Sequence, residues 1–283
     1  MHRNALIAPV TFTPVSPAII FTDLDGTLID SHKRIAAHAA ATIRRVYEGG
    51  IPFCPVTARS PHGVDPIWRQ LGFSGPLAAF SGALVLDEAR DPLFSCTIPL
   101  GTAVEIKRFL NAELVNVVVN AFSFDTWVTD DKESPRVQAE ERTVELSATA
   151  CHDLTQAFDE RGIHKFLLMG APEDLTAAEA RIRERFPGLN VARSNADLVE
   201  INEPGASKSQ AVEVLCGHYG VRLAQAVAFG DGHNDIPLLA AVPESYAVAN
   251  ASDEVKRAAA HMLAWTNDEG AVARQLEVLF PEG

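Results

Sequence analysis

The sequence has little of what marks secreted, disulfide-rich or membrane-spanning proteins. Its four cysteines stand far apart in the chain, at Cys54, Cys96, Cys151 and Cys216. This spacing fits neither a disulfide-dense scaffold nor a paired zinc site, so it favours a reducing, cytoplasmic setting. The apolar run near the start, ALIAPV, is short and interrupted by proline, which is too little for a signal-peptide core or a membrane span. Residues 1–17 are expected to form an N-terminal extension.

Positive charge is also scarce. The chain has 24 Lys and Arg against 37 Asp and Glu, a net charge of -13. Binding to nucleic acid or to an anionic membrane needs clustered cations, so neither is expected as a partner. An anionic substrate would have to be held by local charge. The 283 residues, 47% of them hydrophobic, suffice for one large or two ordinary globular domains.

Several apolar runs end in polar or glycine-bearing turns. Examples are AIIF before TDLDGT, GIPFCPV before TARS, PLAAF before SGA, AVAFG before DGHND and SYAVA before NAS. Such runs, separated by helical patterns, are typical of a parallel sheet covered on both faces. They predict an α/β fold with a Rossmann-like, doubly wound core. Its ligands are expected beyond the carboxyl ends of the strands, where the polar turns converge.

The middle of the chain has a different pattern. From about Leu86 to about Val191, strand candidates follow one another more closely and none ends in an acidic or glycine-rich turn. This favours a smaller α+β unit inserted into the core. The predicted core therefore comprises residues 18–85 plus 192–283, and the predicted cap comprises residues 86–191.

Four separated segments carry groups suited to phosphoryl transfer: TDLDGT, PVTAR, GASKSQ and GDGHND. Each alone has an ordinary explanation as a turn, a helix cap or a solvated lysine. Together they would gather carboxylates that repel one another unless a cation lies among them, and hard oxygen ligands suit Mg²⁺. Lys208 would add positive charge on a phosphoryl group, and the Thr57 hydroxyl would hydrogen-bond its oxygens. Attack by an aspartate would give an acyl phosphate.

As a set, these segments resemble the motifs of the haloacid dehalogenase-like hydrolase superfamily. The closest resemblance is to its Cof-type, class IIB phosphatases, which carry a large cap between the second and third motifs. The resemblance extends over essentially the whole chain from about Ala18. The matching residues are Asp23, Asp25, Gly26 and Thr27 in the first motif, Thr57 in the second, Lys208 in the third, and Gly230, Asp231, Asn234 and Asp235 in the fourth.

The resemblance implies a role for each matched residue. Asp23 is the implied nucleophile and a metal ligand, and Asp25 is the implied general acid and base, whose backbone carbonyl also binds the metal. Thr57 and Lys208 are implied phosphoryl binders. Asp231 is the remaining implied Mg²⁺ ligand, while the residues implied to support the metal or its waters are Asn234 and Asp235.

The sequence departs from the family pattern at two places. Ala58 stands where the second motif commonly has glycine, and Ser81 stands where N-G-A is frequent. Arg59, Ser81 and Gly82 are candidate substrate-binding residues, with a structural salt bridge as the alternative role for Arg59.

The expected function is that of a Mg²⁺-dependent phosphomonoesterase acting on a small, soluble phosphate ester such as a sugar phosphate. Two alternatives use the same residues. One is a phosphomutase, an isomerase that passes the phosphoryl group to another sugar hydroxyl. The other is a non-catalytic protein that binds a phosphometabolite.

Overall fold

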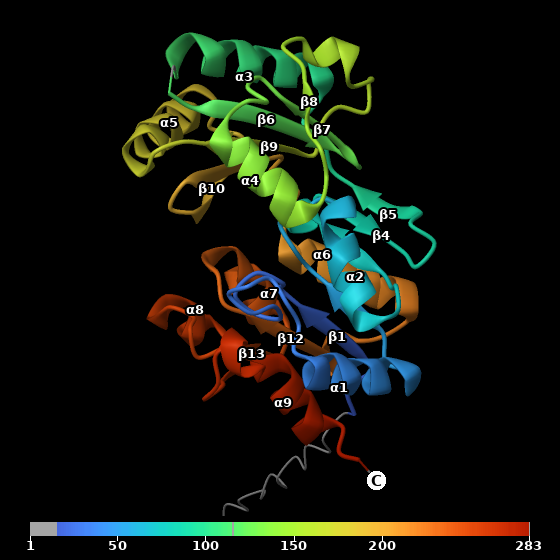
Figure 1. Ribbon diagram of the computed structural model, residues 1–283. Helices are drawn as coiled ribbons and strands as arrows, with labels where there is room; N and C mark the ends of the chain where they lie inside the picture. Colours follow the sequence, from blue (N-terminus) through green and yellow to red (C-terminus); the bar gives the residue numbers. More distant parts are fainter. Residues whose placement is uncertain (1–15, 115, 283) are drawn as a thin grey trace, which may run out of the picture.

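Two sheets of different build divide the chain into two units, a core and a cap, which lie one below the other in Figure 1. The computed structural model describes residues 16–114 and 116–282. The predicted extension, residues 1–17, therefore lies almost wholly outside the described residues. No helix in the described ranges is long and apolar enough to cross a bilayer.

The core sheet has the order β14-β13-β12-β1-β2, and all its neighbouring strands run parallel. The apolar runs predicted as buried strands supply its four longest members. The strands are β1 (Ile19–Thr22), β2 (Phe53–Pro55), β12 (Ala226–Gly230), β13 (Glu244–Ala247) and β14 (His261–Met262).

Helices cover both faces of this sheet. Because side chains alternate along a strand, Ile20 packs in one cluster, with residues of α1, α2 and α9, and Ile19 and Phe21 pack in another, with residues of α6 and α7. This confirms the predicted doubly wound α/β core. The helices of the core are α1 (Ala37–Glu48), α2 (Asp65–Leu71), α6 (Lys208–Tyr219), α7 (Ile236–Ala241), α8 (Asp253–Ala258) and α9 (Ala271–Leu279).

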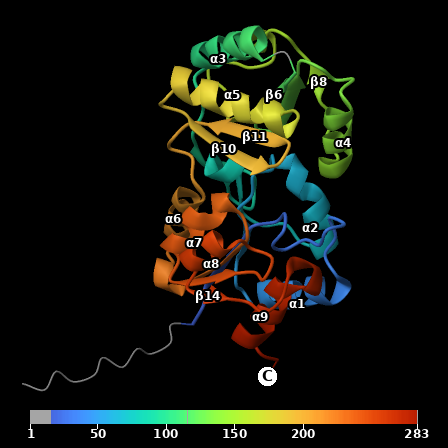
Figure 2. The same ribbon diagram turned by 90° about the vertical axis from the view of Figure 1, so that its left-hand side faces the viewer.

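The cap sheet has the order β10-β11-β9-β6-β7-β8 and is antiparallel except for the β7–β8 pair. Figure 2 shows α3 and α5 on the side of this sheet that faces away from the core. The elements of the cap are α3 (Leu100–Glu113), β6 (Val118–Ser123), β7 (Thr126–Thr129), α4 (Pro135–Val144), β8 (Thr149–Ala150), β9 (Lys165–Met169), α5 (Pro172–Arg185), β10 (Asn190–Asn195) and β11 (Leu198–Asn202).

The two faces of strand β9 lie in different surroundings. Phe166 and Leu168 are fully buried in the cluster that contains α3 and α5. Lys165, Leu167 and Met169 lie on the opposite face and line a cavity that they share with the core. The two-residue period of a strand therefore separates the cap's own core from the surface that it presents to the site.

Strand pairing corrects both predicted boundaries of the cap. At the start, β4 (Leu84–Leu86) and β5 (Pro92–Ser95) pair with β3 (Leu77–Ala79), which is bridged to the core through Val56 and Ala78. At the end, β11 pairs with β9. The cap sheet therefore includes residues beyond 191, up to Asn202, and the segment up to Ser95 belongs with the core. A local apolar pattern does not reveal which strand is the pairing partner.

Candidate active site

The segments predicted to converge meet at the carboxyl edge of the core sheet. Asp23 follows β1, Thr57 lies two residues after β2, and Asp231 follows β12. Since β1 is hydrogen-bonded to both β2 and β12, these three side chains lie beside one another. All three line a cavity of about 610 Å³ whose other walls come from the cap.

Lys208 links two of the acids beneath this cavity. Its Nζ lies 2.5 Å from Asp23 Oδ1 and 2.5 Å from Asp235 Oδ1, and all three side chains are buried. Burial raises the pKa of Asp23 well above its usual value, and nearby Asp235 and Asp231 add to this, while Lys208 opposes it. Burial alone would lower the pKa of Lys208, but Asp23 and Asp235 raise it above its usual value. The lysine therefore stays protonated next to Asp23.

Glycine at position 26 allows the backbone of the first motif to lie close to the Asp231 side chain. Gly26 has φ +85°, and a Cβ there would lie 2.4 Å from Asp231 Oδ2. The next residue, Thr27, donates its hydroxyl to Asp231 Oδ1 at 2.6 Å. Burial raises the pKa of Asp231 to about 6 despite this hydrogen bond, and the charge of Asp235 also contributes.

Asp23, Asp231 and Asp235 each offer a carboxylate oxygen within 4.8 Å of the others. Such a group is unfavourable when fully ionised without a cation, and its donors are all hard oxygens, so these residues fit Mg²⁺. In Asp235, Oδ1 accepts from Lys208, and Oδ2 accepts from the backbone N–H groups of Asp231 and Gly232. Both oxygens of Asp235 are therefore already in use, whereas Asp23 and Asp231 face the cavity.

The side chain of Asp25 lies apart from this cluster. Arg59 binds it in a two-pronged ion pair, with Nε 2.7 Å from Oδ2 and Nη2 2.8 Å from Oδ1, and Lys33 Nζ is 2.6 Å from Oδ1. Burial would raise the pKa of Asp25, but the hydrogen bonds and charges of Arg59 and Lys33 outweigh it and lower the pKa to about 2. Arg59 also donates to the Gly63 carbonyl at 3.1 Å. This geometry contains the ion pair of the salt-bridge alternative for Arg59; because Arg59 also lines the cavity, its contact with substrate stays a prediction.

Ser81 and Gly82 are not among the described residues that line the cavity, and their contact with substrate stays a prediction. Ser81 Oγ lies 3.4 Å from Glu200 Oε2 of the cap. Gly82 has φ +97°, and a Cβ there would lie 2.1 Å from the Ser207 carbonyl oxygen. Gly82 therefore allows the close approach of the residue that precedes Lys208 at the start of α6.

Several residues near the site lie outside the predicted set of site residues. Lys33 reaches Asp25 from a loop, and Asn250 donates to the Gly26 carbonyl at 2.8 Å. From the cap, Lys165 donates to the Ala58 carbonyl at 2.7 Å and pairs with Glu200 at 3.7 Å. The contact of Lys165 with Ala58 depends on how the cap is placed over the core, which no motif encodes, whereas Lys33 and Asn250 make their contacts within the core.

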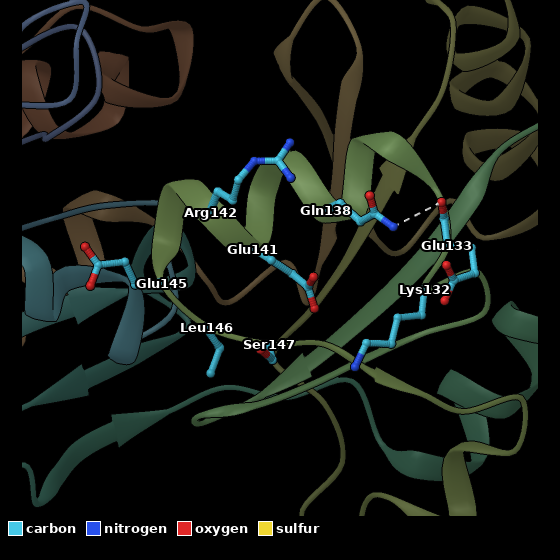
Figure 3. A pocket seen from close by; sticks show the side chains of 8 residues that line it. All are labelled: Lys132, Glu133, Gln138, Glu141, Arg142, Glu145, Leu146 and Ser147. Atoms are coloured by element: carbon cyan, nitrogen blue, oxygen red, sulfur yellow. Dashed lines mark hydrogen bonds between the residues drawn. The ribbon is translucent and has the colours of Figure 1, made fainter.

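A second pocket lies on another side of α4 and is shown in Figure 3. The residues that line it are Lys132, Glu133, Gln138, Glu141, Arg142, Glu145, Leu146 and Ser147. None of the predicted catalytic residues is among these described residues. Of the predicted catalytic residues, Asp23, Asp25 and Thr57 instead line the cavity at the edge of the core sheet.

Comparison with known proteins identifies the family. The family model described as haloacid dehalogenase-like hydrolase matches residues 20–276. A protein of Haemophilus influenzae, named provisionally as a phosphatase, is 35% identical over 266 residues, which cover 93% of this chain and 98% of that protein. An HMP-PP phosphatase of Yersinia pseudotuberculosis is 25% identical over 239 residues, covering 83% of this chain and 85% of the relative.

Solved structures show the same architecture. A haloacid dehalogenase-like hydrolase from Bacteroides thetaiotaomicron superposes with a TM-score of 0.86 at 26% identity, covering 94% of this chain and 100% of that one. TM0651 from Thermotoga maritima superposes with a TM-score of 0.81 at 22% identity, covering 94% and 98%. The fold, with its Rossmann-like core and inserted cap, is thus shared with these proteins.

The chain belongs to the haloacid dehalogenase-like hydrolase family. Within that family it is a phosphatase of the Cof type. The predicted resemblance is confirmed.

Proposed function

We propose that this protein is a Mg²⁺-dependent phosphomonoesterase that hydrolyses a small phosphate ester through a phosphorylated Asp23. The observation that carries the proposal is the placement of Asp23 at the floor of the cavity, buried, and bound through Oδ1 to Lys208. A carboxylate oxygen held beside an ammonium group can attack phosphorus because the lysine offsets the negative charge of the incoming phosphate.

The neighbouring residues supply the other groups that two displacements need. Thr57 lines the cavity, where its hydroxyl can donate to a phosphoryl oxygen, and Lys208 can bridge Asp23 and the phosphoryl group. Asp25 is two residues from Asp23, and its carboxylate, which Arg59 and Lys33 keep ionised, would take a proton from the attacking water. Its other expected step, protonation of the leaving oxygen, requires that the bound substrate first weaken these ion pairs. Arg59 would hold that carboxyl in place, through the ion pair described above.

The side chains of Asp23 and Asp231, with the backbone carbonyl of Asp25, would hold Mg²⁺, supported by Asn234 and Asp235. When bound, the ion would supply positive charge that offsets both the acids and the substrate phosphate.

Replacement of Asp23 tests the proposal. The Asp23→Asn variant keeps the size of the side chain but removes the nucleophilic carboxylate, so kcat for p-nitrophenyl phosphate should fall at least about a thousandfold. Release of inorganic phosphate would be measured directly, with no bisphosphate added, which separates a phosphatase from a phosphomutase. Asp253→Asn is the matched control, because Asp253 is exposed in the first turn of α8. Turnover by Asp23→Asn at the rate of the unaltered protein would refute the proposed role of Asp23.

A further inference from the structure

The charged side chains that line the cavity are almost all in ion pairs or hydrogen bonds, with one exception. Four cations line the cavity, and each lies in an ion pair with a carboxylate that also lines it. Lys33 and Arg59 pair with Asp25, Arg136 Nη1 lies 2.8 Å from Asp197 Oδ2, and Lys165 pairs with Glu200. No cation among these described residues is left over to receive a second anionic group on a substrate.

Glu140 is the exception among the lining carboxylates. Of the six that line the cavity, it alone has no hydrogen bond or ion pair to any residue within the described ranges. It is partly buried, and burial raises its pKa, while the nearby charges of Lys165 and Arg59 lower it. Its surroundings thus include the buried lysine above the Thr57–Arg59 segment and the arginine beside Asp25.

Helix α4 fixes the direction in which Glu140 faces. Residues three and four apart share a helix face, so Arg136, Ala139, Glu140 and Thr143 form one side, and all four line the cavity. Val137 and Val144 pack into the large core cluster, and the remaining side forms the pocket of Figure 3. Packing of Val137 and Val144 therefore fixes the rotation of α4 about its own axis, and this rotation directs Glu140 to the cavity.

From this geometry we infer that Glu140 determines specificity: it selects phosphate monoesters whose leaving group carries an ammonium or other hydrogen-bond-donating group, and it disfavours leaving groups that carry a second anion. The inference rests on the proposed function. A carboxylate without a partner in a partly desolvated cavity attracts a cation and repels an anion far more strongly than it would in water. The paired cations around it offer the anion no compensation.

Three aryl phosphates of matched size test this inference. They are phenyl phosphates that differ only in the para substituent. The aminomethyl substituent carries one positive charge, the hydroxymethyl substituent carries none, and the carboxymethyl substituent carries one negative charge. A methylene separates each charge from the ring, so the phenolate leaving groups are similar. The measurement is kcat/KM from phosphate release, expressed as the ratio of the aminomethyl to the carboxymethyl ester.

The unaltered protein should prefer the aminomethyl ester. In Glu140→Gln the ratio should fall by about tenfold, because one unit charge close to the substrate is removed, and in Glu140→Lys the carboxymethyl ester should become the better substrate. Glu141→Gln is the matched control. Glu141 lies on the opposite side of α4, lines the pocket of Figure 3 and accepts a hydrogen bond from the Ala148 N–H, which glutamine can also accept. Its ratio should match that of the unaltered protein.

Two negative outcomes are distinguishable. If all three esters are hydrolysed and Glu140→Gln leaves the ratio unchanged, or if Glu141→Gln lowers it equally, the role of Glu140 is refuted and the proposed function stands. If the unaltered protein releases no phosphate from any of the three, the proposed function fails, and this inference fails with it.

Discussion

At the scale of single residues, buried charge is what distinguishes this site. Asp23, Lys208 and Asp235 are almost fully buried, yet each has a partner of opposite charge. Within the described part of the chain, Asp231 has no cationic partner in an ion pair and accepts instead from Thr27. An uncompensated carboxylate next to two others is costly, so binding of a cation should stabilise the folded protein.

Mg²⁺ should therefore raise the thermal unfolding midpoint of the protein. At a concentration a hundred times the dissociation constant, binding to the folded state alone contributes about 2.7 kcal/mol. Asp231→Asn should largely abolish this rise, whereas Asp253→Asn should leave it unchanged. Differential scanning fluorimetry with and without MgCl₂ measures both. An equal rise in all three proteins would show that the ion does not bind at Asp231.

His164 provides a second prediction at this scale. It is fully buried; its Nδ1 accepts from the Phe124 N–H at 3.4 Å, and its Nε2 lies 3.0 Å from Ser95 Oγ. Burial, with a smaller effect of Arg161, lowers its pKa to about 4. The ring is therefore neutral in the folded state, while in the unfolded chain the pKa is about 6.5.

Between these two pKa values the unfolded chain binds a proton that the folded chain does not. His164 should thus cost the protein about 2 kcal/mol of unfolding free energy as the pH falls from about 7 to about 5. Urea unfolding at the two pH values measures the loss, and His164→Gln should show a correspondingly smaller one. The same loss in both proteins would assign the acid sensitivity to other groups.

At the scale of elements, the position of α6 depends on the turn that it packs against. The helix begins at Lys208, and the carbonyl of its N-cap Ser207 lies where a side chain at position 82 would be. Any larger residue there must move the start of α6. That movement would carry Lys208 away from Asp23.

Gly82→Ala should therefore reduce both stability and activity. The positive φ and the contact with Ser207 together should cost about 2 kcal/mol or more of unfolding free energy. Gly217→Ala is the matched control, since Gly217 lies exposed within α6 with nothing within 4 Å of an added Cβ. It should stabilise the protein by about 0.5–1 kcal/mol. Urea unfolding and phosphate release measure both variants, and unchanged kcat in Gly82→Ala would contradict this account.

The elements also show how far the sequence predicts the structure. The convergence of Asp23, Thr57 and Asp231 was predictable, because parallel strands end at one edge of a sheet. That β10 and β11 belong to the cap sheet was not predictable, because an apolar pattern does not show which strand a segment pairs with. The position of Glu140 in the cavity was equally unpredictable from the sequence. Its role depends on the rotation of α4, which is set by tertiary packing of Val137 and Val144.

At the scale of the whole molecule, Lys165 connects the cap to the core loop of residues 57–59. It is buried, donates to the Ala58 carbonyl and lies over the rings of Phe80 and Phe122 at 5.7 Å and 5.3 Å. Ala58 stands between Thr57 and Arg59, two residues that line the cavity. The placement of the cap and the conformation of this loop are thus coupled through one ammonium group.

Lys165→Met should lower kcat as well as stability. Removing the ammonium group leaves Glu200 buried without its cation, which should cost about 3 kcal/mol of unfolding free energy. Lys107→Met is the control: Lys107 is also buried in the cap, and its ion-pair partner is Asp130, within the same unit. Both variants should lose stability in urea unfolding, but only Lys165→Met should lose turnover of p-nitrophenyl phosphate. Equal turnover in the two variants would exclude the proposed coupling.

The alternation along β9 has a consequence for how such enzymes diverge. Phe166 and Leu168 hold the cap together, whereas Lys165, Leu167 and Met169 face the cavity that contains Asp23. Evolution can therefore exchange Leu167 and Met169 and retune substrate choice while Phe166 and Leu168 keep the hydrophobic interior of the cap intact. Lys165 is the exception on this face, because it also holds Glu200 and the Ala58 carbonyl. A lineage that duplicated this gene would reach new specificities through positions 167 and 169, with little loss of foldability along the way.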